Sequence, residues 1–415
     1  MALKSRQWLL IAALLVWADP AAAADSACVV LSKLVDQRQS APVFLASFPG
    51  VTSGPLSGVG FTYDNSVATI ALIACGKTVK ASRMGDALLA AQTNDRYWHD
   101  GRLRNGYLSG ATNDRPLKLP GWWDNTQNMW VEDQYQMGSD NGNQAWAMLA
   151  LLALYRANGD QRYLAGAERI GAYVEKFSDA RAPGGFNGGP FGDEPQPITN
   201  TWKSTEHNTD LAAAFTQMAE ATKQEHLRSD AREAQSFVDA MWNGECACFA
   251  VGTAEDGQTI NPYLALDAQV WPLLALPGYA EKFSSVLDTL QKRLKDGDGF
   301  SYSEAKEGMW TEGTAQAALF LTLSGQEQSA QEYLAAIEEN RAPDDSYYAA
   351  SVNELPTGFM LQTDPTQPRL YFHISHLAAL SWAALAQERF NPFRAVSVRH
   401  ESGFPEGRER RSLGK

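Results

Sequence analysis

Two kinds of helical segment alternate along this chain, and this alternation restricts the fold more than any other feature. Six segments are apolar on nearly every side, a pattern that suits a helix enclosed by protein, namely residues 62–74, 143–155, 205–219, 264–275, 311–323 and 374–387. Six others have one apolar face, namely residues 28–37, 79–92, 161–177, 228–242, 279–294 and 327–338. This strict alternation predicts an all-α, (α/α)6 toroid over residues 25–394, in which six inner helices are enclosed by six outer helices.

The connections between these segments have very unequal lengths. Long stretches such as residues 92–142 and 340–373 lead from an outer helix into the next inner helix, whereas the links from inner to outer helices are mostly short. Pro272 falls inside the fourth inner segment and is expected to kink it. One face of the toroid should therefore carry the loops, and functional residues are expected on that face.

The two ends of the chain have a different character. Lys4 and Arg6 precede a short apolar run and an Ala-rich region that ends at Ala24, an order typical of a cleavable signal peptide over residues 1–24. Residues 395–415 have no apolar period and are expected to form a disordered tail. Together these patterns predict a periplasmic or secreted protein.

Charge and membrane patterns exclude two classes of partner. The formal net charge of −13 argues against nucleic acid, whose phosphates require a basic surface. No segment after the signal peptide is long and apolar enough to predict a membrane span.

Four cysteines are available for disulfides in an exported chain. Cys28 and Cys75 could join the first two helices, whereas Cys246 and Cys248 are close together for a mutual bridge. A metal site at this C-x-C is disfavoured because no histidine pair completes it, and we expect structural or incidental thiols.

Polar residues gather at the predicted N-termini of the inner helices. Single Asp and Glu residues there are explained by helix capping and the helix dipole, but the outer helices lack the same concentration. Converging carboxylates raise one another's pKa, as an acid catalyst requires. The set comprises Tyr63 and Asp64, Glu132 and Asp140, Glu206, His207 and Asp210, Asp267, Glu312, and His373 and His376.

Tryptophans accompany these carboxylates in the loops that lead to the inner helices. They are Trp122, Trp123, Trp130, Trp202 and Trp310. A single Trp is usually part of a core, but several loop Trp residues beside carboxylates favour platforms for sugar rings, with acidic groups binding the hydroxyls. The sequence therefore predicts an oligosaccharide or polysaccharide as the substrate.

Other catalytic motifs are missing from the sequence. The Gly-rich residues 183–189 follow no strand and lack a Lys-Ser/Thr, so they do not predict a phosphate site. No H-E-x-x-H motif occurs among the six histidines, and no nucleophile elbow surrounds Ser204. We therefore expect no metal and no other cofactor.

With these features, the chain resembles the six-hairpin glycosidase superfamily. The resemblance rests on the twelve alternating helices and on the motifs Tyr63-Asp64-Asn65, Gly121-Trp122-Trp123, residues 202–208, residues 261–267, residues 310–313 and Asn391-Pro392-Phe393. It implies acid–base catalysis at the inner-helix N-termini. In an inverting glycosidase two carboxyl groups stand roughly 6.5–9.5 Å apart. The expected acid is Glu206, the favoured base is Glu132, and Asp64 and Glu312 come next.

The same resemblance leaves three functions open. The first is an inverting glycoside hydrolase that acts on a neutral or weakly charged bacterial glucan or exopolysaccharide. The second is a sugar epimerase or isomerase, for which His207, His373 and His376 would transfer protons. The third is a glycan-binding protein without catalysis. Expected substrate-binding residues are Tyr63, Trp122, Trp123, Trp130, Trp202, His207, Asp210, Asp267, Trp310 and His373.

Overall fold

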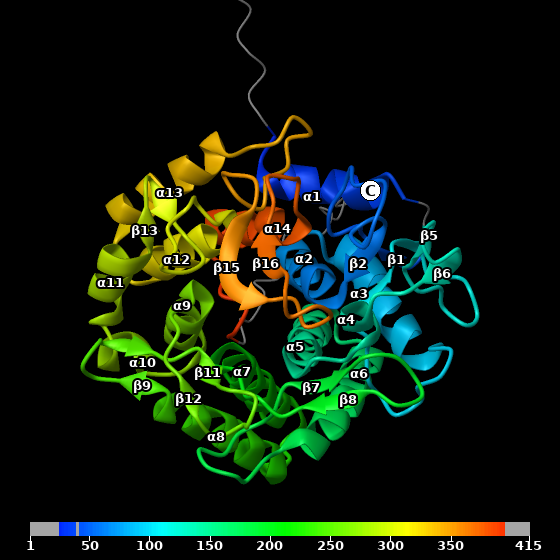
Figure 1. Cartoon of the computed structure of the whole chain (residues 1–415), viewed down its shortest axis with the longest axis horizontal. Coiled ribbons are helices and arrows are strands. Elements are labelled where there is room, and N and C mark those ends of the chain that lie inside the picture. Colours follow the sequence, from blue (N-terminus) through cyan, green and yellow to red (C-terminus); the bar gives the residue numbers. More distant parts are fainter. Residues whose placement is uncertain (1–24, 39–40, 395–415) are drawn as a thin grey trace, which may run out of the picture.

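The computed structural model describes residues 25–38 and 41–394 and is mostly helical. The predicted signal peptide and the predicted tail lie outside these residues. Six inner helices form the centre, α2 (Thr62–Ala74), α5 (Asn141–Asn158), α7 (Thr205–Thr222), α9 (Leu266–Ala275), α12 (Thr311–Leu323) and α14 (Leu377–Gln387). Each inner helix packs against the next, and α14 packs against α2, so the ring closes on itself (Figure 1).

The outer ring encloses these helices. Its members are α1 (Ala27–Asp36), α3 (Thr78–Thr93), α6 (Gln161–Val174) with a short 3-10 turn at Glu175–Phe177, α8 (Glu225–Ala240), a broken fifth element and α13 (Glu327–Glu339). Most outer helices contact inner helices through one apolar face, as α8 does against α7. The predicted (α/α)6 toroid is confirmed.

The fifth outer element differs from the continuous helix expected over residues 279–294. It consists of α10 (Tyr279–Lys282), α11 (Val286–Thr289) and a π-helical turn at Leu290–Leu294. Ser284 and Ser285 occupy the break, where serine side chains compete for the backbone hydrogen bonds of a helix. In the neighbouring inner helix, Pro272 lies inside α9 without ending it.

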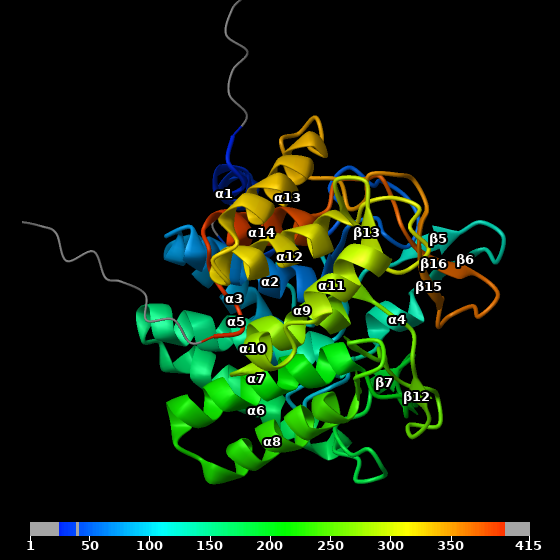
Figure 2. The ribbon, with the colours of Figure 1, turned by 90° about the vertical axis from the view of Figure 1, so that its left-hand side faces the viewer.

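Short antiparallel strand pairs and the small helix α4 (Gln134–Met137) lie in the connections between the helices. Figure 2 shows β5, β6, β15 and β16 projecting together on one side of the helices. The strand pairs are β1 (Val43–Phe44) with β4 (Gly110–Ala111), β2 (Val59–Phe61) with β3 (Gly106–Leu108), β5 (Trp122–Asp124) with β6 (Met129–Val131), β7 (Gly189–Phe191) with β8 (Ile198–Asn200), β9 (Trp242–Asn243) with β10 (Cys248–Phe249), β11 (Gly252–Thr253) with β12 (Ile260–Asn261), β13 (Lys295–Asp296) with β14 (Gly299–Phe300), and β15 (Leu355–Met360) with β16 (Pro368–Tyr371).

Aromatic side chains fill the axis of the toroid. Trp146, Trp271 and Trp382 are each the sixth residue of an inner helix, and these helices alternate around the ring. Their rings lie 5.3–6.0 Å apart and contact Phe393, which follows the last helix. Because these side chains are buried, the centre of the ring is a packed core and not a channel.

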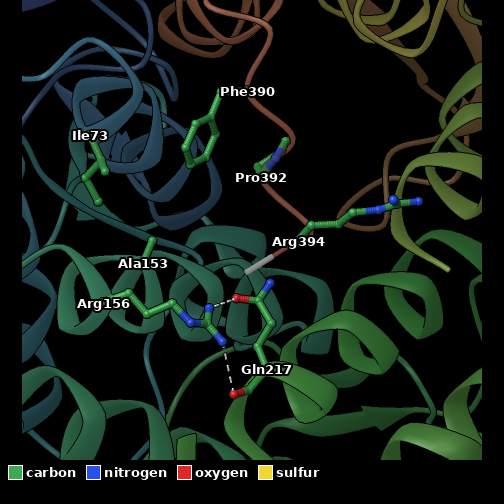
Figure 3. Close-up of a pocket in the computed structure, with 7 residues that line it drawn as sticks. All are labelled: Ile73, Ala153, Arg156, Gln217, Phe390, Pro392 and Arg394. Carbon is green, nitrogen blue, oxygen red and sulfur yellow. Dashed lines mark hydrogen bonds between the residues drawn. The ribbon is translucent and has the colours of Figure 1, made fainter. Parts of the chain in front are cut away.

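The opposite end of the axis is closed by the chain that follows α14. Figure 3 shows a small crevice there, lined by Ile73, Ala153, Arg156, Gln217, Phe390, Pro392 and Arg394. The Arg156 guanidinium donates to the Gln217 backbone oxygen at 3.2 Å and also bonds the Gln217 side chain. Among the described residues, the aromatic core and this chain segment close the axis on the side away from the loops.

Two disulfides form among the described residues, Cys28–Cys75 and Cys246–Cys248. The first ties α1 to the end of α2, as the sequence suggested. The second disulfide forms although its two cysteines have a sequence separation of only 2. Within residues 25–38 and 41–394, no helix is long and apolar enough to cross a bilayer.

Candidate functional site

Each inner helix places a titratable group at its N-terminal end. Asp64, Glu206, Asp267 and Glu312 lie in the first turns of α2, α7, α9 and α12. Asp140 and His376 are the N-cap residues of α5 and α14. Because the inner helices run in the same direction around one axis, these groups meet on the loop face. We call these six residues the carboxylate ring.

A buried imidazole joins two carboxylates of this ring. His376 Nε2 lies 3.3 Å from Asp64 Oδ2, and His376 Nδ1 lies 4.0 Å from Glu312 Oε2. The imidazole also stacks on Phe48 at 4.8 Å. Burial disfavours the charged ring, but the Asp64 and Glu312 carboxylates outweigh burial and raise the pKa of His376. His376 thus holds Asp64 and Glu312 in place beneath the surface.

Glu312 is fixed by further hydrogen bonds. Tyr63 donates its hydroxyl hydrogen to Glu312 and accepts a hydrogen bond from Trp382 Nε1 at 2.8 Å. Gln316 donates to Glu312 at 3.2 Å. Burial raises the pKa of Glu312 to about 7, with Asp64 and Asp267 adding to the rise and His376 and Tyr63 opposing it. These contacts hold the buried Glu312 carboxyl group in a fixed position.

Glu206 is more accessible than the other carboxylates of the ring. It is half-buried, whereas Asp64, Asp140, Asp267 and Glu312 are at most 5% exposed. Burial and the neighbouring Asp267 carboxylate raise the pKa of Glu206 well above its usual range, although Arg369 opposes this. Glu206 is therefore the carboxyl group of the ring best placed to meet a ligand while still holding its proton.

Asp267 is more deeply buried than Glu206, and its pKa is raised less. Burial raises the pKa of Asp267 to about 6, while the backbone N–H of Ala268 and the Arg369 guanidinium limit the rise. The Ala268 N–H donates to Asp267 Oδ1 at 2.6 Å. The pKa of Glu206 is thus raised well above its usual range, while that of Asp267 stays nearer to its own. Pairs of carboxyl groups whose pKa values are pushed apart are the usual signature of an acid and a base.

Two more carboxyl groups are buried near this pair. Burial raises the pKa of Asp140 to about 7. Asp210, the sixth residue of α7, is fully buried, and burial together with the Glu206 carboxylate raises its pKa well above the usual range. Asp210 therefore lies at the level of the aromatic core, below Glu206.

Arg369 provides a positive charge above the carboxylates. It lies on β16, in the hairpin that crosses in front of the ring's centre in Figure 1. Its guanidinium interacts electrostatically with Tyr135, Tyr371, Tyr302 and Glu206, yet the residue is exposed to solvent. Arg369 was not among the predicted site residues, because these were chosen among carboxylates, histidines and aromatic residues, although Arg369 comes only shortly before the α14 N-cap His376.

The β15–β16 hairpin that carries Arg369 is anchored on both sides. At its base, Tyr371 packs against Trp310, with ring centroids 5.3 Å apart, and Tyr263 donates its hydroxyl hydrogen to the Thr357 carbonyl at 2.9 Å. At its far end, Gln362 donates to Asn200 at the end of β8. The hairpin therefore fixes the position of Arg369 over the ring.

The predicted base, Glu132, is part of an ion-pair network. Glu132 forms a two-pronged ion pair with Arg96, at 2.7 and 2.6 Å, and Arg96 also pairs with Glu194. Glu132 follows the β5–β6 hairpin at the rim, so its sequence proximity to α5 does not bring it to the helix N-terminus. The structure places Glu132 in a salt-bridge network rather than in the carboxylate ring.

The predicted sugar-binding residues separate into a central and a peripheral group. Tyr63, Asp210, Asp267 and His207 lie with the carboxylate ring, and Trp202 packs beside His207 at 5.4 Å. Burial lowers the pKa of His207 to about 4.

The other predicted residues lie further from the ring. Trp310 is 2% exposed and packs beneath Tyr302 and Tyr371. His373 stacks on Tyr348 and bonds the Ala350 carbonyl, and Trp122, Trp123 and Trp130 lie on the rim hairpin.

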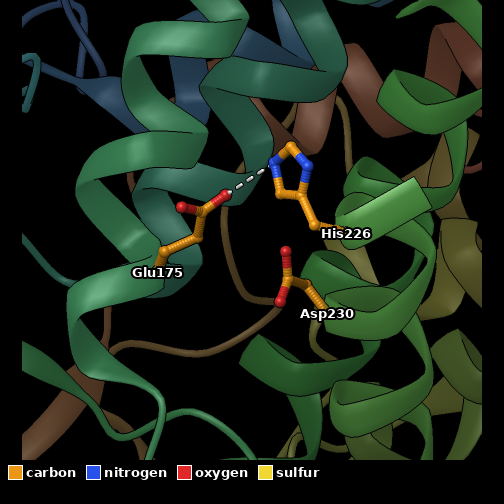
Figure 4. Close-up of side chains that lie close together, drawn as sticks. All are labelled: Glu175, His226 and Asp230. Carbon is orange, nitrogen blue, oxygen red and sulfur yellow. Dashed lines mark ion pairs between the residues drawn. The ribbon is translucent and has the colours of Figure 1, made fainter. Parts of the chain in front are cut away.

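One cluster among the described residues has ligand types suitable for a metal. Glu175, His226 and Asp230 bring their ligand atoms within 4.8 Å of one another (Figure 4). They lie on the outer wall, between the turn after α6 and the start of α8, and His226 pairs with Glu175 at 3.4 Å. Only His226 of this cluster is exposed, and the cluster lies on the outer ring, away from the carboxylate ring.

No family model and no curated protein sequence matches the chain. Solved structures do share its fold. A glycosidase variant in complex with glucose superposes with a TM-score of 0.58 at 13% identity, over 88% of this chain and 95% of that one. A sugar epimerase from a ruminal bacterium gives a TM-score of 0.60 at 12% identity, over 86% and 95%. A GH76 α-mannanase from Bacteroides thetaiotaomicron gives 0.54 at 11%, over 88% and 95%.

Proposed function

We propose that this (α/α)6 toroid, the fold of the six-hairpin glycosidases, is an exported glycoside hydrolase that cleaves a neutral bacterial glucan or exopolysaccharide. The observation that carries the proposal is the Glu206–Asp267 pair, which joins two carboxyl groups in the first turns of neighbouring inner helices. The pKa of Glu206 is raised well above its usual range, and that of Asp267 is raised to about 6. Glycosidase structures of the same fold add support. Asp267 replaces Glu132 as the favoured base.

In the proposed reaction, Glu206 protonates the oxygen of the scissile glycosidic bond as that bond breaks. Asp267 accepts a proton from a water molecule, whose oxygen attacks the sugar carbon from the opposite side. The products are two shorter glycans, and the configuration at the attacked carbon is inverted. Arg369 stabilises the ionised Asp267. Glu312, Asp64 and His376 form the rigid floor of the site.

Export is part of the proposal. The two disulfides are typical of proteins that mature in an oxidising compartment such as the periplasm. They support the periplasmic or secreted location that the N-terminal pattern predicts.

A sugar epimerase is the second candidate. His207 is half-buried beside Trp202, and its low pKa keeps it neutral and able to accept a proton. The epimerase from a ruminal bacterium shares the fold. His376 is less suited to this role because only 4% of it is exposed and two carboxylates hold it.

Proton NMR in deuterated water distinguishes the two reactions in one experiment. Purified protein is incubated with neutral glucans, mannans and their oligosaccharides. A hydrolase releases new reducing ends that appear first as the anomer opposite to the cleaved linkage. Deuterium at a sugar carbon without chain cleavage would establish the epimerase instead, and glycan binding without any product would leave only a binding protein.

A further inference from the structure

The rim hairpin β5–β6 carries two exposed tryptophans on one face. Trp123 and Trp130 are directly opposite each other in the register of the hairpin, so both side chains point to the same side. They are 53% and 54% exposed, which is rare for so large an apolar side chain. Trp122, which pairs with Val131, lies on the other face and is half-buried. The hairpin therefore presents two indoles to solvent.

The hairpin holds this face rigidly. A Cβ added at Gly121 would lie 2.6–2.8 Å from three atoms of the Trp130 indole, so the indole packs on a backbone that has no room for a side chain. At the turn, Asp124 accepts backbone hydrogen bonds from Thr126 and Gln127 at 2.7 and 3.0 Å. At the base, Glu132 is fixed by Arg96. A rigid aromatic surface loses little conformational entropy when it binds a ligand.

The chemistry around the indoles indicates what they bind. The turn supplies Asn125, Thr126, Gln127 and Asn128, whose amides and hydroxyl suit sugar hydroxyl groups. Residues 119–155 contain no Lys or Arg, so the hairpin has no cation to attract an anionic lipid surface or an anionic polymer. Exposed aromatic faces with amides and no basic charge favour an uncharged glycan.

The hairpin is separate from the carboxylate ring. In Figure 1 it lies at the edge of the toroid, whereas the inner-helix ends lie at the centre, and in Figure 2 it projects on the same side as β15 and β16. A ligand on Trp123 and Trp130 is therefore outside the proposed catalytic site but on the same face of the molecule.

We propose that Trp123 and Trp130 form a second, peripheral glycan-binding site that holds a distant part of a neutral polysaccharide. The proposal rests on the proposed action on carbohydrate and narrows the substrate to a polymer. It explains why two indoles are kept on a rigid hairpin that contributes no carboxylate to the ring.

Affinity electrophoresis in native gels that contain a neutral mannan or a neutral glucan tests this site without catalysis. Glu206→Gln protein is the reference, so that turnover does not degrade the gel. We expect at least one polysaccharide to retard the reference protein, and Trp123→Ala/Trp130→Ala to weaken the apparent affinity at least fivefold. Gly121→Ala, which keeps both indoles but displaces Trp130, should have a smaller effect in the same direction.

A matched control uses other exposed apolar residues of the loop face. Ile198 and Ile260, on β8 and β12, are 64% and 48% exposed, and Ile198→Ala/Ile260→Ala should leave the retardation unchanged. Equal retardation of the Trp double variant and the reference overturns the proposal, as does the absence of retardation by every neutral polysaccharide. Loss of binding to phosphatidylglycerol vesicles instead of polysaccharide would assign the hairpin to a membrane. Retardation that depends on the two Trp residues supports the peripheral binding site even if the protein hydrolyses no glycan. The binding-site proposal and the hydrolase proposal can therefore be refuted independently.

Discussion

At the residue scale, burial and neighbouring charge assign different roles to similar carboxyl groups. Glu206 and Glu312 are each the second residue of an inner helix, yet Glu312 is enclosed by Tyr63, Gln316 and His376 while Glu206 is half-buried. The sequence shows both residues at helix N-termini and could not show this difference, because the contacts of Glu312 come from segments distant in the chain.

Arg369 should set the pH range of the reaction. Its guanidinium lowers the pKa of both Glu206 and Asp267, so Arg369→Met removes that effect and both pKa values rise. Asp267 must be ionised and Glu206 protonated, so the acidic and the alkaline limbs of the pH–kcat/KM profile should both move to higher pH. Arg96→Met is the control, because Arg96 pairs with Glu132 and Glu194 and should leave the profile in place. An unchanged profile in the Arg369 variant would contradict the proposed electrostatic role.

At the element scale, the helices were predictable because burial on all sides or on one side leaves a clear apolar pattern. The starts of α2, α7 and α12 agree with the predicted segments, since Thr62, Thr205 and Thr311 follow loop residues and precede long apolar runs. The break after α10 was not predicted, because serine also occurs inside helices, so Ser284 and Ser285 do not by themselves mark an end. The ion pair of Glu132 was not predictable for a related reason, since its partner, Arg96, lies 36 residues away in the sequence.

The two disulfides should differ strongly in their effect on stability. Cys28–Cys75 closes a loop with a sequence separation of 47, for which the chain-entropy model gives up to about 4 kcal/mol. Cys246–Cys248 has a separation of 2 and restricts the unfolded chain far less. In urea unfolding, Cys28→Ser/Cys75→Ser should lower the free energy of unfolding by about 2–4 kcal/mol. Cys246→Ser/Cys248→Ser is the matched control, and an equal loss in both variants would refute the loop-closure explanation.

At the scale of the whole molecule, the repeated pairs of inner and outer helices form a single site. Six helix N-termini meet on one face, the aromatic core of Trp146, Trp271 and Trp382 closes the axis beneath them, and the long connections supply Arg369 and the rim hairpin. The sequence predicted which face carries the long connections, because loop length and helix direction are local properties. It could not rank the carboxylates, because their pKa values depend on how the ring closes.

The central claim is that catalysis belongs to the carboxylate ring and depends on Glu206. The most direct test is reducing-end release from the best neutral glycan by wild type, Glu206→Gln and Glu132→Gln, each checked for intact folding by circular dichroism. Loss of a general acid is expected to reduce kcat by at least about 100-fold in Glu206→Gln, while Glu132→Gln keeps most of the wild-type rate. The opposite ranking, or full activity in Glu206→Gln, would contradict the account.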